Sequence, residues 1–232
     1  AEIITAFLDF IGANQDLSGR KILISAGGTR EAIDPVRFIG NRSSGKQGLA
    51  LAVEARNRGA QVTLVLANSN IADISGINII RVETAEQMYN ALQSQMLSSD
   101  VLIMAAAVSD ARPASVAKDK IKKNELTTIA LTSNMDILKE LASGAKDSQI
   151  IVGFAAETTN IEASGVAKLA SKNLDFIYVN DVSHGAIFAS DESAGYLISA
   201  DGESTYIAQT SKAKVAKYIL DKVVSRLGYA NG

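Results

Sequence analysis

Three polar loops carry the residues that could do chemistry, and each follows an apolar run typical of a buried strand. The first loop, residues 27–48, contains the stretch Gly40-Asn41-Arg42-Ser43-Ser44-Gly45-Lys46-Gln47-Gly48 just before a predicted helix. Backbone amides at a helix start, with small Ser and Gly side chains beside them, form a site for phosphate. We therefore expect this loop to bind a phosphate group. The alternative is a helix start that is merely capped by Ser and Gly.

The second loop follows the apolar run 101–108 and combines small residues with one acid, Asp110. Ala105 and Ala106 would let a flat base or sugar lie against the backbone, and the Asp110 carboxylate can accept from a hydroxyl or an amine. The loop continues into a positive segment suited to a polyphosphate, with Lys118, Lys120, Lys122 and Lys123. A solvated surface loop is the alternative interpretation.

The third loop follows Ala156 and leads into a helix that carries Lys168 and Lys172. Positions i and i+4 share one helix face, where like charges cost a few tenths of a kcal/mol. An anion bound between the two lysines would remove that cost. Many surface helices tolerate such pairs, so this signal is weak by itself.

Four other functional interpretations are rejected because the surrounding sequence does not support them. Residues 40–47 nearly match a P-loop, but Gln47 stands where a magnesium-binding hydroxyl is needed. No Gly-x-Gly-x-x-Gly follows the first strand, which counts against a dinucleotide fold. Tyr218 and Lys222 match the Tyr-x-x-x-Lys of short-chain dehydrogenases, yet they flank an apolar face of the last predicted helix. His184 is expected to be a loop residue.

Composition excludes several classes of protein. The 232 residues include no Cys and one His, so disulfides, thiolate nucleophiles and Cys-ligated metals are excluded, and a Ser-His-Asp triad is disfavoured. Lys+Arg 23 against Asp+Glu 25 gives a net charge of −2, which argues against nucleic-acid binding by a basic surface. No apolar run approaches the roughly 20 residues that span a bilayer, and no signal peptide opens the chain. We expect no membrane partner and a cytoplasmic location.

The elements that must position these loops alternate between strand and helix. The pattern predicts strands at 22–24, 62–67, 77–82, 101–108, 127–131, 150–154 and 176–179, and helices at 44–58, 85–97, 135–142 and 161–173. A hairpin at 196–199 and 205–208 and a helix at 212–227 follow. This is the pattern of an α/β, Rossmann-like, mostly parallel sheet with helices on both faces, whose ligands bind at the carboxyl ends of the strands. Residues 1–19 are expected to be a helical linker remnant before one domain, 20–232.

Seven stretches together resemble the phosphopantothenoylcysteine synthetase family of bacterial coenzyme A biosynthesis. They occur in the family's order and cover most of residues 21–227. They are Ser25-Ala26-Gly27-Gly28-Thr29-Arg30-Glu31, Ile33-Asp34-Pro35-Val36-Arg37, Asn41-Arg42-Ser43-Ser44-Gly45-Lys46-Gln47-Gly48, Ala105-Ala106-Ala107-Val108-Ser109-Asp110, Lys120-Ile121-Lys122-Lys123, Val152-Gly153-Phe154-Ala155-Ala156-Glu157-Thr158 and Asn180-Asp181-Val182.

The resemblance implies a ligase that uses CTP to convert the carboxylate of 4′-phosphopantothenate into an acyl-cytidylate, which the amine of L-cysteine then attacks. Asn41 resembles the residue that holds the acyl-cytidylate and assists its conversion, and Lys120 the one that acts on the triphosphate. The implied nucleotide-binding positions are Ala105, Ala106, Asp110, Lys120, Met135, Asp136, Ile137, Leu138, Phe154, Lys168 and Lys172; the family commonly has Pro where Met135 stands. Expected phosphate and substrate positions are Gly28, Thr29, Arg37, Ser43, Ser44 and Gly45. Mg²⁺ is expected with CTP, with no carboxylate assigned to it.

The resemblance also implies partners. We expect a homodimer, with the hairpin 196–208 as candidate interface, and fusion in the full-length protein to a flavin-dependent decarboxylase, with no flavin in this chain. The competing class is an NAD(P)-dependent oxidoreductase, which needs an acidic residue ending the second strand where Ala67-Asn68 stands. A nucleotide-binding module without turnover also stays open. The choice of CTP over ATP rests on the resemblance alone.

Overall fold

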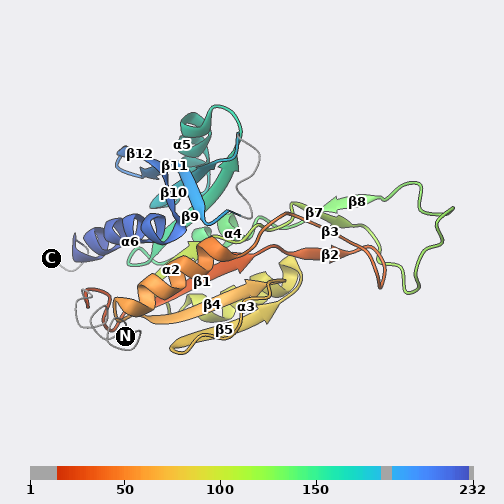
Figure 1. Cartoon of the computed structure of the whole chain (residues 1–232), viewed down its shortest axis with the longest axis horizontal. Coiled ribbons are helices and arrows are strands. Elements are labelled where there is room, and N and C mark those ends of the chain that lie inside the picture. The colour runs from red at the N-terminus through yellow and green to blue at the C-terminus, as the bar shows by residue number, and fades with distance from the viewer. Residues whose placement is uncertain (1–14, 184–189, 230–232) are drawn as a thin grey trace.

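An eight-stranded, mostly parallel sheet forms the centre of the molecule (Figure 1). The computed structural model describes residues 15–183 and 190–229. The strand order is β12-β11-β10-β9-β6-β1-β4-β5, in which only the pairs made by β11 are antiparallel. The strands are β1 (Lys21–Gly27), β4 (Gln61–Ala67), β5 (Ile77–Val82), β6 (Val101–Met104), β9 (Ile150–Glu157), β10 (Phe176–Asp181), β11 (Glu192–Ser199) and β12 (Ser204–Ser211). The predicted fold class is confirmed.

Helices cover both faces of the sheet and close two cores. They are α2 (Lys46–Asn57), α3 (Ala85–Met96), α4 (Ile137–Ser143), α5 (Ile161–Ser171) and α6 (Lys212–Tyr229). α2 packs against α6 on one face, whereas α3, α4 and α5 supply the core of the other. β1 is buried on both sides, because Ile22 and Ile24 enter the first core and Leu23 the second. Among the described residues, no helix is long and apolar enough to cross a membrane.

Two short hairpin-like ladders form an arm that projects from the carboxyl ends of the central strands (Figure 1). β2 (Arg30–Ala32) pairs with β3 (Phe38–Gly40), and β7 (Ala111–Pro113) pairs with β8 (Leu131–Ser133). β2 lies beside β7, so the loops after β1 and β6 extend together. We call residues 29–40 and 111–133 the arm.

The arm is where the predicted elements fail. The strand predicted at 101–108 ends at Met104. Its pairing with β1 is interrupted there and resumes only as an isolated parallel bridge between Gly28 and Ala107, in which the Ala107 N–H donates to the carbonyl of Gly27, 2.8 Å away. The strand predicted at 127–131 is misplaced: β8 starts at Leu131, where it meets β7. β2, β3 and β7 were not predicted. Residues 1–14 of the expected helical linker, and His184, lie outside the described residues.

The described residues before β1 are tied to the domain. Leu17 is fully buried in the core beneath α2 and α6. The guanidinium of Arg58, at the end of α2, binds the Asp16 carboxylate at 2.6 Å and that of Asp221 on α6 at 2.8 Å. Residues before 20 therefore already contact the domain. The predicted division into a linker, 1–19, and a domain, 20–232, stays a prediction.

Replacing Gly27 with Ala is expected to destabilise the fold by more than about 3 kcal/mol, since no small movement can accommodate the new methyl group. Gly27 has a φ of 83°, and a Cβ there would lie 1.9 Å from the carbonyl oxygen of Ala67. Gly202 is the matched control: its φ is 91°, but a Cβ would meet nothing within 4 Å. Gly202→Ala should cost only the left-handed backbone penalty of about 1 kcal/mol. Urea unfolding of both variants tests this; equal losses would contradict it.

Candidate functional site

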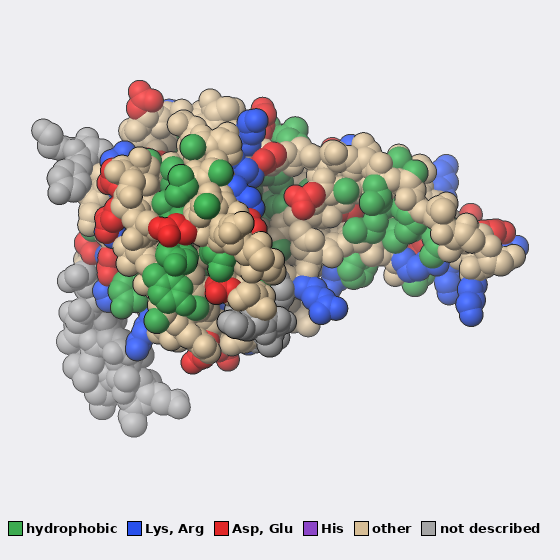
Figure 2. All heavy atoms as spheres, turned by 90° about the horizontal axis from the view of Figure 1, so that it is seen from above, with side chains coloured by type: hydrophobic (Ala, Val, Ile, Leu, Met, Phe, Trp, Pro, Cys, Tyr) green, Lys and Arg blue, Asp and Glu red, His purple; other side chains and the backbone are tan. Residues whose placement is uncertain are grey.

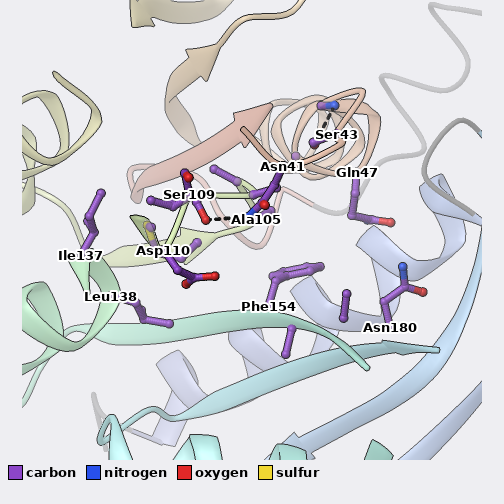
Figure 3. A pocket seen from close by; sticks show the side chains of 18 of the residues that line it. Asn41, Ser43, Gln47, Ala105, Ser109, Asp110, Ile137, Leu138, Phe154 and Asn180 are labelled. Carbon is purple, nitrogen blue, oxygen red and sulfur yellow. Dashed lines mark hydrogen bonds between the residues drawn. The ribbon is translucent and has the colours of Figure 1, made fainter. Parts of the chain in front are cut away.

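A cleft of about 660 Å³ lies at the carboxyl ends of the central strands (Figures 2 and 3). It sits where the sheet order changes direction, with β4 on one side of β1 and β6 on the other, which is where open α/β sheets bind ligands. Its walls come from the start of α2, the loop after β6, the start of α4, the end of β9 and one face of α5. The three loops singled out in the sequence therefore meet at one place.

Asn41 joins the first two loops. Its side-chain amide donates to the carbonyl oxygen of Val108 at 2.8 Å, and Figure 3 shows the side chain at the wall between α2 and the loop after β6. The start of α2 follows at once: Gly45 has a φ of 76°, and its N–H donates to Ser43 Oγ at 3.3 Å. Ser43, Ser44 and Gly45 all line the cleft. The amides of α2 are thus presented to it, as anion binding requires.

The loop after β6 is held by buried hydrogen bonds. The N–H of Ser109 donates to Thr29 Oγ1 at 2.9 Å, and the Asn134 amide donates to the carbonyl of Ser109 at 2.8 Å. Ala105, Ala106 and Asp110 belong to this loop and line the cleft (Figure 3). The side chains of Ala105 and Ala106 are small, which suits the predicted contact with a flat base or sugar.

Two lysines close the far wall, each beside a carboxylate. Lys168 Nζ lies 2.6 Å from Glu157, and Lys172 Nζ lies 2.8 Å from Asp136. Burial acts to raise the pKa of Asp136, but the hydrogen bonds from Lys172 and from the Lys139 N–H outweigh it, and the net pKa is below the usual value. The repulsion expected between the two lysines is therefore already relieved by acidic partners. A phosphate entering the cleft would exchange these carboxylates for its own oxygens.

An aromatic surface forms one side of the cleft. The ring of Phe154 packs 5.5 Å from that of Tyr178, tilted by 56°. Tyr178 is buried, burial raises the pKa of its phenol to about 12, and its hydroxyl bonds with Ser193 Oγ at 2.9 Å. Phe154 is thereby held rigidly, with the geometry to contact a planar base.

Most of the predicted site residues line this cleft, and four do not. Those lining it are Asn41, Ser43, Ser44, Gly45, Ala105, Ala106, Asp110, Met135, Asp136, Ile137, Leu138, Phe154, Lys168 and Lys172. Gly28 and Thr29 lie behind it. Thr29 is fully buried, and its hydroxyl oxygen accepts a hydrogen bond from the N–H of Ser109. Arg37 and Lys120 belong to the arm. Ligand contact by all of these predicted residues stays a prediction.

Eight polar residues lining the cleft were not among the predicted site residues: Arg42, Lys46, Gln47, Ser109, Asn134, Asn180, Ser193 and Lys212. Asn180 is the penultimate residue of β10, and the rule that ligands bind at carboxyl ends of strands points to it. Ser193 and Lys212 come from the antiparallel strand β11 and the start of α6, where no local signal marks them. Burial lowers the pKa of Lys212, as does nearby Lys46.

The described residues contain no cluster of three or more His, Cys, Asp or Glu that could hold a metal. Asp110 and Asp136 are carboxylates of the cleft, and Asp136 is already paired with Lys172. A magnesium ion that arrives on nucleotide phosphates needs only one or two protein carboxylates, so the donor set fits a nucleotide-carried ion and not a resident one.

Comparison with known proteins gives consistent matches over most of the chain. The family model described as "DNA/pantothenate metabolism flavoprotein C-terminal domain" matches residues 17–227. The coenzyme A biosynthesis bifunctional protein CoaBC of Mycobacterium tuberculosis is 44% identical over 224 residues, covering 91% of this chain and 54% of the relative. CoaBC of Vibrio parahaemolyticus is 46% identical over 211 residues, with 89% and 53% covered. The chain spans about half the length of these relatives.

Solved structures match as well. The C-terminal domain of a CoaBC protein is 38% identical, with a TM-score of 0.80 over 93% of this chain and 99% of that one. A Cab2 H337A mutant in complex with phosphopantothenate-cysteine shares the fold at 17% identity, with a TM-score of 0.74 over 99% and 93% of the two chains.

Proposed function

The chain belongs to the family of the DNA/pantothenate metabolism flavoprotein C-terminal domain, and from this membership we propose that it is a ligase that joins 4′-phosphopantothenate to L-cysteine at the expense of CTP. Relatives named for coenzyme A biosynthesis and a fold neighbour holding phosphopantothenate-cysteine support the choice of substrates. One observation carries the proposal: a single cleft combines an exposed helix start, an aromatic wall and two lysines. That combination suits two phosphate-bearing substrates, one of which has a base.

The proposed reaction has two steps. A carboxylate oxygen of phosphopantothenate attacks the α-phosphorus of CTP, the bond to the β-phosphate breaks, and pyrophosphate leaves. The amine of cysteine then attacks the acyl carbon, the acyl–oxygen bond breaks, and CMP departs with the former carboxylate oxygen while the amine loses a proton. No protein atom forms a covalent bond, so the contribution of the chain is positioning and charge neutralisation.

The nucleotide is assigned to the side of the cleft nearest α4 and α5. Phe154 supplies a flat contact for the base, Ala105 and Ala106 leave room for it, and Asp110 accepts from a hydroxyl or amine. The start of α4, residues 135–138, and the lysines at 168 and 172 complete this side. Mg²⁺ would arrive on the triphosphate and would neutralise charge on the leaving pyrophosphate, and no protein carboxylate is assigned to it.

The phosphate of phosphopantothenate is assigned to the start of α2. Gly45 begins this end, and the hydroxyls of Ser43 and Ser44, which accept from the N–H groups of Gly45 and Lys46, can donate to the phosphate. Asn41 stands between this end and the nucleotide side. Asn41 is thus placed to contact the acyl-cytidylate where its two halves join. Thr29 acts from behind, through the bond from the Ser109 N–H to its hydroxyl. Gly28 lets the backbone of Asn41 approach, since a Cβ there would lie 2.6 Å from the Asn41 carbonyl oxygen.

We propose that the arm makes this protein a homodimer. Five large apolar side chains of the arm are exposed: Val36 at 60%, Phe38 at 50%, Val116 at 58%, Ile129 at 38% and Leu131 at 54%. Figure 2 shows apolar side chains gathered on this projection. An apolar patch of this kind on so slender an element favours burial against a second copy, arm on arm. We prefer this interface to the hairpin at 196–208.

A dimer also gives Lys120 a place to act. Lys120 does not line the cleft of its own chain, and the segment between β7 and β8 that contains it forms the far end of the arm (Figure 1). We propose that it reaches the triphosphate in the cleft of the second copy. An ammonium beside the β- and γ-phosphates would stabilise the charge that develops as pyrophosphate leaves.

The relatives are bifunctional, and the matching part is about half of each. We propose that in the full-length protein the chain is joined covalently to a flavin-dependent decarboxylase, and that both work in the cytoplasm. Flavin chemistry belongs to that other half, so the purified chain should lack flavin absorbance. An NAD(P)-dependent oxidoreductase is not favoured by the family match.

Lys172→Gln is expected to raise the KM for CTP about tenfold, because one charge-assisted contact to phosphate is lost. The effect on kcat should be smaller, since the lysine neutralises the bound nucleotide as well as the transition state. Lys222→Gln is the matched control: it breaks a pair with Glu203 outside the cleft. Steady-state kinetics with CTP varied check this. An unchanged KM would remove Lys172 from the nucleotide site.

The proposed function is tested by mixing the enzyme with all three substrates. Phosphopantothenoylcysteine, CMP and pyrophosphate should appear in equal amounts, and replacing CTP by ATP should slow the reaction. Binding of CTP without any turnover would instead identify a nucleotide-binding module.

A further inference from the structure

A buried carboxylate organises the arm. Asp34 lies in the turn between β2 and β3, and its side chain is fully buried. Its Oδ1 accepts from the backbone N–H groups of Val36 and Arg37, at 2.8 and 2.9 Å. Its Oδ2 accepts from Arg37 Nε at 2.9 Å, from a second guanidinium nitrogen of Arg37 and from the N–H of Ile121 at 3.2 Å. A carboxylate with five donors is a structural centre of the arm.

Asp34 and Arg37 together hold the segment that carries Lys118, Lys120, Lys122 and Lys123, because they bind the N–H and the carbonyl of Ile121. Ile121 donates its N–H to Asp34, and its carbonyl accepts from the Arg37 guanidinium at 2.7 Å. Four residues earlier, the N–H of Ala117 donates to the carbonyl of Ile33 at 3.0 Å. Lys120 lies between these two anchors, immediately before Ile121. Its backbone position is therefore set by residues 33–37.

The charge of Asp34 is part of this arrangement. The hydrogen bond from Arg37 holds the pKa of the Asp34 carboxyl well below its usual value, so the group is ionised at neutral pH. The Arg37 guanidinium is committed to Asp34 and to Ile121, which places it on the arm and away from the cleft of its own chain.

We propose that Asp34, acting with Arg37, is a positioning residue that holds Lys120 where its ammonium can act on the triphosphate. This rests on the function proposed above, in which Lys120 serves the first step only. Asp34 therefore controls acyl-cytidylate formation and leaves the attack of cysteine unaffected. A misplacement of about 1 Å at a catalytic group costs up to about 100-fold in rate.

The test is Asp34→Asn, which keeps the shape of the side chain and removes its charge. Single-turnover release of pyrophosphate without cysteine should slow by about 10- to 100-fold. Cysteine-dependent conversion of acyl-cytidylate that is already bound should keep its rate. Asp73→Asn is the matched control, because it breaks an exposed carboxylate–guanidinium pair with Arg81, 2.6 Å long, outside the cleft.

Two further measurements separate positioning from general damage. The rate of Asp34→Asn combined with Lys120→Ala should equal that of Lys120→Ala alone, since the anchor has no effect once its lysine is gone. Trypsin should also cleave the native Asp34→Asn protein faster after Lys118 and Lys120. Arg37→Lys, which keeps the charge but loses the planar fork, should show the same pattern more weakly and serves if Asp34→Asn fails to fold.

The proposal is overturned if Asp34→Asn slows both steps alike, or if its effect multiplies with that of Lys120→Ala. If the unmodified protein forms no acyl-cytidylate at all, the proposed function fails, which is a distinct outcome.

Discussion

Asn41→Asp should reduce amide formation by more than about 100-fold while leaving a single turnover of CTP to pyrophosphate intact. The substitution removes the N–H that donates to the Val108 carbonyl, 2.8 Å away, and sets a carboxylate against that oxygen. It also adds negative charge where, in our account, CMP must leave as an anion. The second step is therefore impaired more than the first.

Rapid-quench measurement of pyrophosphate, CMP and amide product tests this expectation. The variant should release a burst of pyrophosphate equal to its active sites and retain acyl-cytidylate. Asn78→Asp is the control, because it makes the same chemical change on the edge strand β5, away from the cleft. Full turnover by Asn41→Asp would refute the role assigned to Asn41.

Lys120→Ala should slow pyrophosphate release by about 100-fold, since the charge on the leaving group loses its cationic partner. The location of Lys120 on the arm makes a sharper prediction possible. Mixed with Asn41→Asp, the variant should regain about one quarter of the unmodified activity, because half the dimers are mixed and each mixed dimer has one intact site.

Subunit exchange between the two inactive proteins, followed by assay, checks the recovery. Asn41→Asp mixed with Asp110→Ala is the control, because both residues line the same cleft of one chain and every site stays defective. Exchange without recovery would place Lys120 and Asn41 of one site on the same chain.

The sheet could be predicted because its strands are long apolar runs separated by amphipathic helices. β1 and β4 are buried along most of their length, and their largely apolar residues predict that burial. The arm could not be predicted in the same way. Its strands have three residues each, too few for a period, and β7 meets β8 only after the intervening segment turns back. Its order depends on Asp34, which accepts hydrogen bonds from nearby Arg37 and also from Ile121, 87 residues along the chain.

The site was predicted to the extent that it lies at the carboxyl ends of parallel strands. Asp110 lies in the loop after β6, Phe154 lies in the second half of β9, and Asn41 lies between β1 and α2; all three meet in one cleft. Residue type does not tell a ligand contact from an internal hydrogen bond: the buried hydroxyl of Thr29 holds the backbone of Ser109, and its predicted ligand contact stays a prediction. Ser193 enters the cleft through the register of β11 on β10, which only the folded sheet defines.

The central claim is that the carboxylate is activated by transfer to CMP, and isotope transfer tests it most directly. Phosphopantothenate labelled with ¹⁸O in its carboxylate is converted with CTP and cysteine, and the products are analysed by mass spectrometry. Our account predicts one labelled oxygen in CMP and none in pyrophosphate. Label in orthophosphate, with CDP as the nucleotide product, would show an acyl phosphate instead and contradict it.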